Sequence, residues 1–241
     1  DDTLHGGVGS DYFIANDGFG RDTVTGGEDV GDAEYDVLDF RGHTQAVTIN
    51  FTGSESGTAA AGTDTVTFSE IEGFWLSNQA DSVDGSASTS AMAIGAGAGD
   101  DTIIGGSGAD AIAGQDGNDL IESGAGNDSI DAGIGNDTVL GGAGDDLIYG
   151  QAGADSLSGG DGSDVVYGGT ETDTIHGGAG DDILFGEAGD DHVGGGVGND
   201  GIAGGAGNDR LHGEAGNDTI SGGIGNDAIF GGAGDDSVVG D

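Results

Sequence analysis

Residues 141–149 read Gly141-Gly142-Ala143-Gly144-Asp145-Asp146-Leu147-Ile148-Tyr149, and units of this form follow one another sixteen times over residues 96–239 without an insertion or deletion. Each unit carries an aspartate at the same place: Asp101, Asp110, Asp119, Asp128, Asp137, Asp146, Asp155, Asp164, Asp173, Asp182, Asp191, Asp200, Asp209, Asp218, Asp227 and Asp236. Two residues further on, each unit has an aliphatic side chain, from Ile103 to Val238. Self-similarity at a fixed period indicates a repeat architecture.

The nine positions of the unit have different requirements. With the aspartate at position six and the aliphatic residue at position eight, position four is glycine in fifteen of the sixteen units, and positions one and two are mostly glycine. Glycine adopts left-handed backbone angles freely, so we expect positions one to six to form a turn that directs carbonyl oxygens inward. Positions seven to nine then form a three-residue strand whose alternation turns position eight inward. Two units make a coil of 18 residues, and the coils stack.

The composition points to a cation as part of the fold. The 241 residues include 58 glycines, no proline and no cysteine, and 46 acidic residues against three basic ones give a net charge of −43. This charge argues against a nucleic-acid partner and against adsorption to anionic membranes, and the absence of cysteine excludes disulfides. A chain so charged repels itself, whereas the regular aliphatic residues indicate a fold. Carboxylate-bearing loops suit Ca²⁺, so we expect this thin core to fold when calcium binds.

Residues 1–39 are an imperfect form of the repeat. Asp11 and Asp22 hold the aspartate position, and a third unit begins at Gly26 and is enlarged over residues 28–35. Both ends of the sequence fall inside a unit, so we expect a segment of a longer protein. There is no charged leader with an apolar core and no apolar run of membrane length, so the sequence predicts no membrane insertion.

Residues 40–94 interrupt the period before the regular array of residues 95–241. Alternation over residues 47–51 predicts a strand, residues 65–68 and 71–76 predict two more, and residues 53–62 predict a loop of small residues. We expect longer, irregular coils on the same solenoid. Most aromatic residues lie here, including Trp75, and they predict a cap or a wider core; a ligand groove is the alternative.

The units match the nonapeptide G-G-x-G-x-D-x-U-x, and the array resembles the RTX (repeats-in-toxin) family. The resemblance implies an all-β, right-handed parallel β-roll with 18 residues per coil and Ca²⁺ between adjacent turns. Its aspartates would then pair at a spacing of 18, Asp101 with Asp119 and Asp110 with Asp128, and bind up to about 14 ions. Asp11 and Asp22 would serve the imperfect repeats. The family also implies type I secretion and an extracellular location.

One unit departs from the pattern. Glu171 replaces the glycine at position four, where a side chain resists the turn. We therefore predict that the ion sites of this loop, which would pair Asp173 with Asp155 and Asp191, are distorted, weaker or empty. Other chemistry has less support, because no EF-hand loop, phosphate loop or catalytic arrangement stands out. We expect no enzymatic activity in this segment.

The outward positions are not dictated by calcium. One face carries an apolar ladder, for which we predict a contact with another domain or protein, with a carbohydrate-stacking platform as the alternative; its members are Leu147, Tyr149, Val165, Tyr167, Ile183 and Phe185. The opposite face carries His176, His192, Arg210 and His212, a group that indicates solvated surface, with a pH-sensitive contact or an adventitious metal as the alternative.

The sequence predicts a calcium-binding module of a secreted or cell-surface bacterial protein, acting as a structural, adhesion or secretion-folding element. An alternative is the accessory module of a secreted protease, lipase or polysaccharide epimerase whose catalytic domain lies elsewhere. Ice binding has less support, because position three is mostly alanine and lacks a regular threonine or asparagine ladder.

Overall fold

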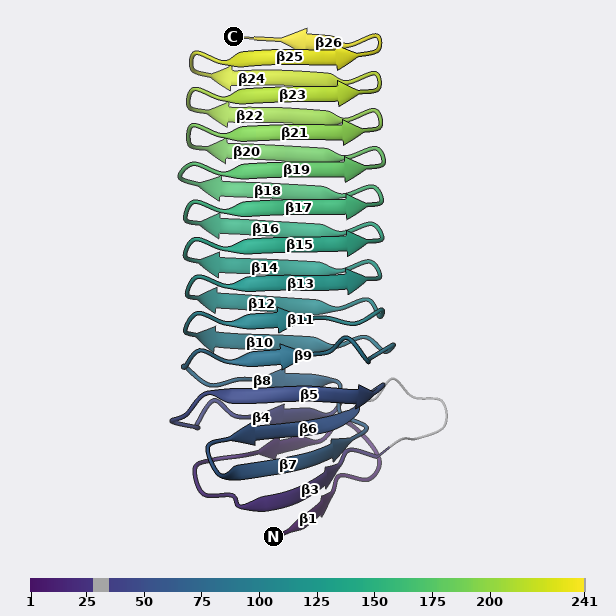
Figure 1. The fold of residues 1–241 in the computed structure, drawn as a ribbon, viewed down its shortest axis with the longest axis vertical. Helices are drawn as coiled ribbons and strands as arrows, with labels where there is room; N and C mark the ends of the chain where they lie inside the picture. The colour runs from purple at the N-terminus through teal and green to yellow at the C-terminus, as the bar shows by residue number, and fades with distance from the viewer. Residues whose placement is uncertain (28–34, 241) are drawn as a thin grey trace.

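The chain folds into one long solenoid made of two facing sheets (Figure 1). The computed structural model describes residues 1–27 and 35–240. The first sheet has fourteen strands, in the spatial order β1 (Thr3–His5), β3 (Arg21–Thr25), β7 (Asp64–Ser69), β6 (Ser56–Ala61), β5 (Val47–Gly53), β9 (Ser82–Asp84), β11 (Thr102–Ile104), β13 (Leu120–Ala125), β15 (Thr138–Ala143), β17 (Ser156–Asp161), β19 (Thr174–Ala179), β21 (His192–Val197), β23 (Arg210–Ala215) and β25 (Ala228–Ala233).

The second sheet has twelve strands and runs along the other side of the coil. Its order is β2 (Tyr12–Ile14), β4 (Val37–Asp39), β8 (Gly73–Trp75), β10 (Ala93–Ala98), β12 (Ala111–Asp116), β14 (Ser129–Ile134), β16 (Leu147–Ala152), β18 (Val165–Thr170), β20 (Ile183–Ala188), β22 (Gly201–Ala206), β24 (Thr219–Ile224) and β26 (Ser237–Val239). No helix in the described ranges is long and apolar enough to cross a membrane.

The regular coils confirm the parallel solenoid and its 18-residue period. Leu147 of β16 pairs with Val165 of β18, and every later pair in the array keeps this spacing. The strands of most coils are six residues long, so the prediction of three-residue strands was wrong. Positions one to three continue the strand because their backbone groups pair with the same positions of the next coil, as Gln151 pairs with Gly169. The turn is therefore confined to positions four to six.

The core of the array is one file of aliphatic side chains from each sheet. The position-eight residues from Ile103 to Ile220 are at most 3% exposed. Position one also points inward, which restricts it to glycine, alanine and serine. Each coil therefore contributes only two large apolar side chains, and the packing is local along the axis.

Residues 40–94 widen this core. Strands β5, β6 and β7 are antiparallel, and Phe51, Phe68 and Phe74 meet edge to face with ring centroids 5.1–5.3 Å apart. The predicted loop at residues 53–62 was wrong, since Ser56–Ala61 is strand β6. Its buried Ala59 lies between Ile49 and Val66, whose larger side chains fill the space that alanine leaves.

Two expectations for the irregular segments have different outcomes. The phenylalanines fill the wider core as predicted, whereas Trp75 occupies an outward position and its ring lies over Gly95 of the next coil. The enlargement predicted over residues 28–35 lies almost entirely outside the described residues.

Candidate calcium sites

The aspartates at position six form two rows along the two edges of the solenoid. The amide of each aspartate donates a hydrogen bond to the Oδ1 atom of the aspartate 18 residues later, as Asp128 does to Asp146 and Asp146 to Asp164. Fourteen such bonds, of 2.8–3.1 Å, link the array. The members of each expected pair therefore lie on adjacent coils.

The second carboxylate oxygen of most of these residues has no partner. The Oδ2 atom is buried without a hydrogen bond in Asp11 and in thirteen aspartates of the array: Asp101, Asp119, Asp128, Asp137, Asp146, Asp155, Asp164, Asp173, Asp182, Asp191, Asp200, Asp209 and Asp218. A buried carboxylate oxygen is costly unless hydrogen bonded or bound to a cation. So regular a set of unsatisfied acceptors indicates a ligand in the same place in every loop.

Backbone carbonyls converge on the same space. A methyl group built on Gly141 would lie 2.5 Å from Asp146 Oδ2 and 2.5 Å from the carbonyl oxygen of Gly159 on the next coil. Gly177 has the same surroundings, with Asp182 Oδ2 at 2.3 Å and the Gly195 carbonyl at 2.5 Å. Two oxygens that face each other with no donor between them suit a cation, and carboxylate with carbonyl oxygen is the donor set that Ca²⁺ prefers.

Side chains alone do not complete these sites. Among the described residues, no group of three or more His, Cys, Asp or Glu side chains is placed to hold a metal ion. An ion in these loops therefore depends on backbone carbonyls as well as on carboxylates. This donor set fits Ca²⁺, which binds six to eight oxygens, and does not fit zinc, which takes nitrogen and sulfur ligands in structural sites.

The backbone of the turn explains the glycines. Except in the unit of Asp110, the glycines at positions two and four of the array have φ between +95° and +157°, as in Gly142 and Gly144. An added Cβ at Gly144 would also lie 1.9 Å from the carbonyl oxygen of Gly126 on the previous coil. The four non-glycine residues at position two are Gln115, Gln151, Glu187 and Glu214, with φ of 72–79°. Position two therefore accepts a side chain at the cost of a left-handed backbone.

The buried carboxyls have raised pKa values. Burial, together with carboxylates on neighbouring coils, raises the pKa of Asp146, Asp173 and Asp182 to about 7. Burial likewise raises the pKa of Asp119 and Asp137 to about 6. In the absence of a cation these groups hold protons close to neutral pH, and a bound cation would displace those protons.

Some predicted site residues lack these features. The Oδ2 atom of Asp110 accepts a bond from Gly106 N, and that loop lacks the left-handed glycines of the others. Asp22 lies within strand β3 and is only half-buried, and Asp227 and Asp236 lie at the half-exposed C-terminal coils. Unlike Asp11, none of these four aspartates has an Oδ2 atom that is both buried and without a hydrogen bond.

Asp81 shows what replaces the cation in the irregular segment. It holds the aspartate position, but its carboxylate accepts bonds from Val47 N, Ser77 N and Ser77 Oγ. A serine at position two therefore supplies donors where the regular loops supply carbonyls. In the sequence, a serine in place of the glycine four residues before the aspartate is the sign that the carboxylate is hydrogen bonded.

The loop of Glu171 keeps the shape of its neighbours. Glu171 has φ of 73°, Asp173 Oδ1 accepts from Asp155 N at 2.9 Å, and Asp173 Oδ2 is unpaired as elsewhere. The distortion is limited to the hydrogen bond from Gly153 N to Thr170 O, which lengthens to 3.4 Å from the usual 2.7–3.0 Å. The Glu171 carboxylate accepts bonds from Gly153 N and Thr170 Oγ1, on the exposed side of the turn.

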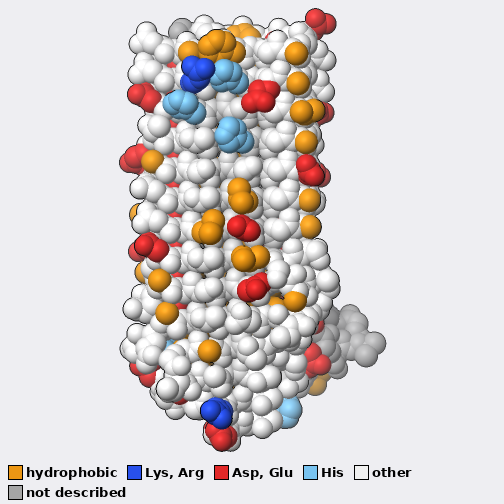
Figure 2. Space-filling model, in the orientation of Figure 1, with side chains coloured by type: hydrophobic (Ala, Val, Ile, Leu, Met, Phe, Trp, Pro, Cys, Tyr) orange, Lys and Arg blue, Asp and Glu red, His pale blue; other side chains and the backbone are white. Residues whose placement is uncertain are grey.

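The outward ladder consists of stacked rings. The ring centroids of Tyr149 and Tyr167 lie 5.0 Å apart, with planes 8° from parallel. The centroids of Tyr167 and Phe185 lie 4.8 Å apart, with planes 10° from parallel. The facing sides of the rings therefore cover one another, and only the outer faces of Tyr149 and Phe185, which pair with Asp131 and Ala203, have no ring beside them. A carbohydrate platform needs free ring faces, so the stack offers it little surface. On the opposite sheet, Figure 2 shows histidine and basic side chains gathered towards the C-terminal end, where His176, His192, Arg210 and His212 lie.

Comparison with known proteins places these loops in a family. The model of the RTX calcium-binding nonapeptide repeat matches residues 1–19, 95–130, 131–166, 167–202 and 203–238, which together exceed half of the chain. The search of curated proteins found no match to the chain.

A solved structure supports the fold. The crystal structure of a hyperactive, Ca²⁺-dependent, β-helical antifreeze protein from an Antarctic bacterium superimposes with a TM-score of 0.53 at 23% identity, covering all of this chain and 80% of the other. At this identity the likeness concerns the fold. The repeat match, which falls on the loops with unpaired carboxylates, identifies this chain as a member of the RTX calcium-binding nonapeptide repeat family.

Proposed function

We propose that the chain is a calcium-folded β-roll module of a secreted or cell-surface protein, serving as a structural or adhesion element. The observation that carries this proposal is the double row of buried, unpaired Asp Oδ2 atoms, which in ten loops of the array lie close to a carbonyl oxygen of the next coil. Without cations the fold brings these carboxylates into a poorly solvated space. Calcium removes that cost, so binding and folding are one reaction.

The proposed ligands of each ion come from two adjacent coils. In the loop of Asp146 they are the Oδ2 atom of this residue and the carbonyl oxygen of Gly159, with further backbone carbonyls completing the shell. The thirteen unpaired carboxylates of the array correspond to thirteen ions, and Asp11 adds one in the N-terminal block. The loops of Asp22, Asp110, Asp227 and Asp236 would bind weakly, because the Oδ2 atom of Asp110 is already hydrogen bonded and the other three carboxylates are less buried.

The extracellular assignment follows from the same coupling. A chain with net charge −43 stays open where calcium is scarce and folds where calcium is abundant, a difference that separates cytosol from the outside of a cell. This behaviour suits export in an unfolded state. Antifreeze activity is not carried over from the structural neighbour, because position three mixes alanine with isoleucine, aspartate and valine, as at Ile134, Asp161 and Val197.

The apolar ladder is the proposed contact with another domain or protein. Ile183 is 47% exposed, and the other five side chains are half-buried by their stacking. A continuous apolar strip on an otherwise small and polar face is the feature that supports such a contact. The ring edges, and the outer faces of the two end rings Tyr149 and Phe185, are available to a partner.

Calcium titration tests the main proposal. The calcium-free chain should gain β-structure by circular dichroism on titration, and native mass spectrometry should count thirteen or fourteen tightly bound ions. Asp146→Asn should lower that count, because the amide removes the charge while keeping the size. Asp145→Asn is the matched control, since Asp145 is exposed and its Oδ1 accepts from Ser163 N, a bond that an asparagine oxygen can keep. Equal effects of the two substitutions, or no gain of β-structure, would contradict the proposal.

Replacing Glu171 by glycine should tighten calcium binding at the loop of Asp173. A left-handed backbone costs a non-glycine residue roughly 1–2 kcal/mol, so we expect about a tenfold gain in affinity at this loop. Glu171→Gln is the control, because it removes the charge but keeps a side chain at a φ of 73°, and it should give no such gain. If calorimetry gives the same isotherm for wild type and Glu171→Gly, the site of Asp173 is not weakened.

Low pH should stabilise the calcium-free fold and weaken calcium binding. The pKa of Asp146, Asp173 and Asp182 is raised to about 7 from an ordinary 3.8, so between these values the folded state binds more protons than the unfolded state. The stability of the calcium-free roll should therefore fall as pH rises through this window. Calcium affinity should rise over the same window, with protons released on binding. Calorimetry in buffers of different ionisation enthalpy measures that release, and no release between pH 5.5 and about 7 would refute this account.

Tyrosine nitration tests the ladder. Tyr149 and Tyr167 should react with tetranitromethane in the dilute, calcium-loaded chain and become protected when the contact forms. Protection at high chain concentration identifies a second copy, and protection only in the intact protein identifies a neighbouring domain. Tyr12, which is 48% exposed and far from the ladder, is the internal control. Unchanged reactivity of all these rings under both conditions would remove the ladder as a contact.

A further inference from the structure

The outward residues at position nine form columns along the solenoid. On β19, β21, β23 and β25 this column consists of His176, Gly194, His212 and Phe230, which pair in register. His212 and Phe230 stack with centroids 4.6 Å apart and planes 11° from parallel. Together with the tyrosine ladder, this shows that rings on consecutive coils at position nine stack at 4.6–5.0 Å. Gly194 has no side chain, so one ring is missing from the column between His176 and His212.

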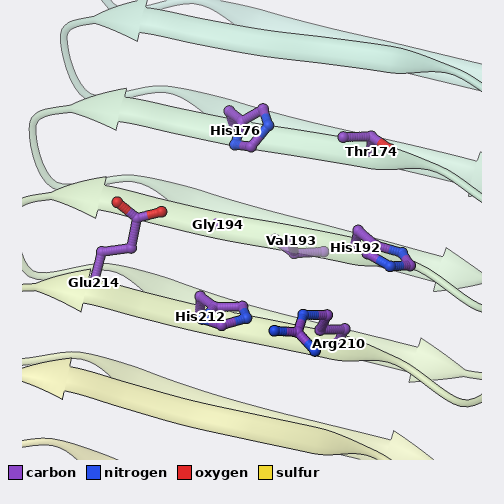
Figure 3. A pocket seen from close by; sticks show the side chains of 8 residues that line it. All are labelled: Thr174, His176, His192, Val193, Gly194, Arg210, His212 and Glu214. Carbon is purple, nitrogen blue, oxygen red and sulfur yellow. The ribbon is translucent and has the colours of Figure 1, made fainter.

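The interruption leaves a notch of about 220 Å³ (Figure 3). His176 and His212 stand two coils apart on either side of it, a separation of about 9.6 Å at the usual strand spacing. That separation is twice the ring spacing found in the two stacks, so one flat ring fits between them. Phe230 covers one face of the His212 imidazole and leaves the other face turned towards the coil of Gly194.

Polar atoms line the floor of the notch. A methyl group built on Gly194 would lie 3.1 Å from Glu214 Oε1 and 3.3 Å from His176 Nδ1. Arg210 also lines the notch, and its guanidinium carbon lies 5.2 Å from the centre of the Phe230 ring. The carboxylate of Glu214 is the hydrogen-bond acceptor nearest to Gly194.

We propose that the notch above Gly194 binds a small molecule with a planar heteroaromatic ring and a protonated amine or ring N–H. The ring completes the position-nine stack between His176 and His212, and the N–H group donates to Glu214. The carboxylate of Glu214 favours a ligand with an N–H donor over an anionic one. Glu214 stands at position two of the unit of Asp218, and the other residues of the notch lie on the strands, away from the calcium loops.

Tryptamine is the probe, because it joins an indole ring to an ammonium group. Titration into the calcium-loaded chain, followed by NMR, should shift the imidazole signals of His176 and His212 through ring currents. Indole-3-acetate has the same ring and the opposite charge, and it should bind at least about tenfold more weakly. Glu214→Gln should reduce this preference, whereas Glu187→Gln, at the same turn position on another coil, should leave it unchanged.

Gly194→Phe provides the decisive variant. Gly194 has no left-handed backbone, so a phenylalanine there supplies the missing ring and should abolish tryptamine binding. Gly201→Phe is the control, because Gly201 lies on the other sheet and has room for a side chain. An added Cβ there would meet only the backbone oxygen of Asp182, at 3.8 Å. Circular dichroism in the presence of calcium checks that both variants fold. Wild-type binding in the folded Gly194→Phe variant, equal binding of the two probes, or shifts at Tyr149 and Tyr167 instead would overturn the proposal.

Discussion

In thirteen aspartates of the array, the Oδ1 atom accepts a hydrogen bond from the previous coil and the Oδ2 atom stays buried without a donor. In the loop of Asp146 the first oxygen accepts from Asp128 N, and the second faces the Gly159 carbonyl with no donor between them. The same hydrogen bond that sets the stacking of the coils therefore fixes the unsatisfied oxygen in place. A cation is the group that resolves this arrangement, so the fold and the ion sites have one geometric origin.

The remaining features of the repeat follow from this constraint. Positions two and four need left-handed backbone angles to turn their carbonyls along the axis, and an added Cβ would touch the carbonyl of the previous coil. Position one must stay small because the unpaired carboxylate oxygen lies beside it. Position eight fills the narrow space between the sheets. Only positions three, five, seven and nine are left free, and of these seven and nine carry the apolar ladder and the histidine face.

The free positions show what stacking at one coil spacing can build. Where consecutive coils carry rings at position nine, the rings cover each other and become part of a stable surface, as in Tyr149, Tyr167 and Phe185. Where one ring is missing, as at Gly194, the same spacing leaves room for a foreign ring. The calcium loops and these columns occupy different sides of each coil, so the outward faces can vary without disturbing the edges.

The sequence by itself determined the 18-residue coil, the inward file of aliphatic residues and the rows of aspartates, because a strict period of nine allows one way of stacking. It did not determine the length of the strands, since the glycines at positions one and two suit both a turn and an extended backbone, and pairing with the next coil decides between them. The strand at Ser56–Ala61 was hidden for a related reason: its alanines carry little apolar signal and depend on Ile49 and Val66 for burial.

Only the tertiary structure distinguished the aspartates from one another. Asp81, Asp110 and Asp146 hold the same place in the sequence pattern, but Ser77 and Gly106 donate to the first two, while Asp146 keeps an unpaired oxygen. The notch at Gly194 also depends on residues 18 positions apart becoming neighbours. A repeat fixes which residues share a column, and the side chains that meet across coils decide what each column does.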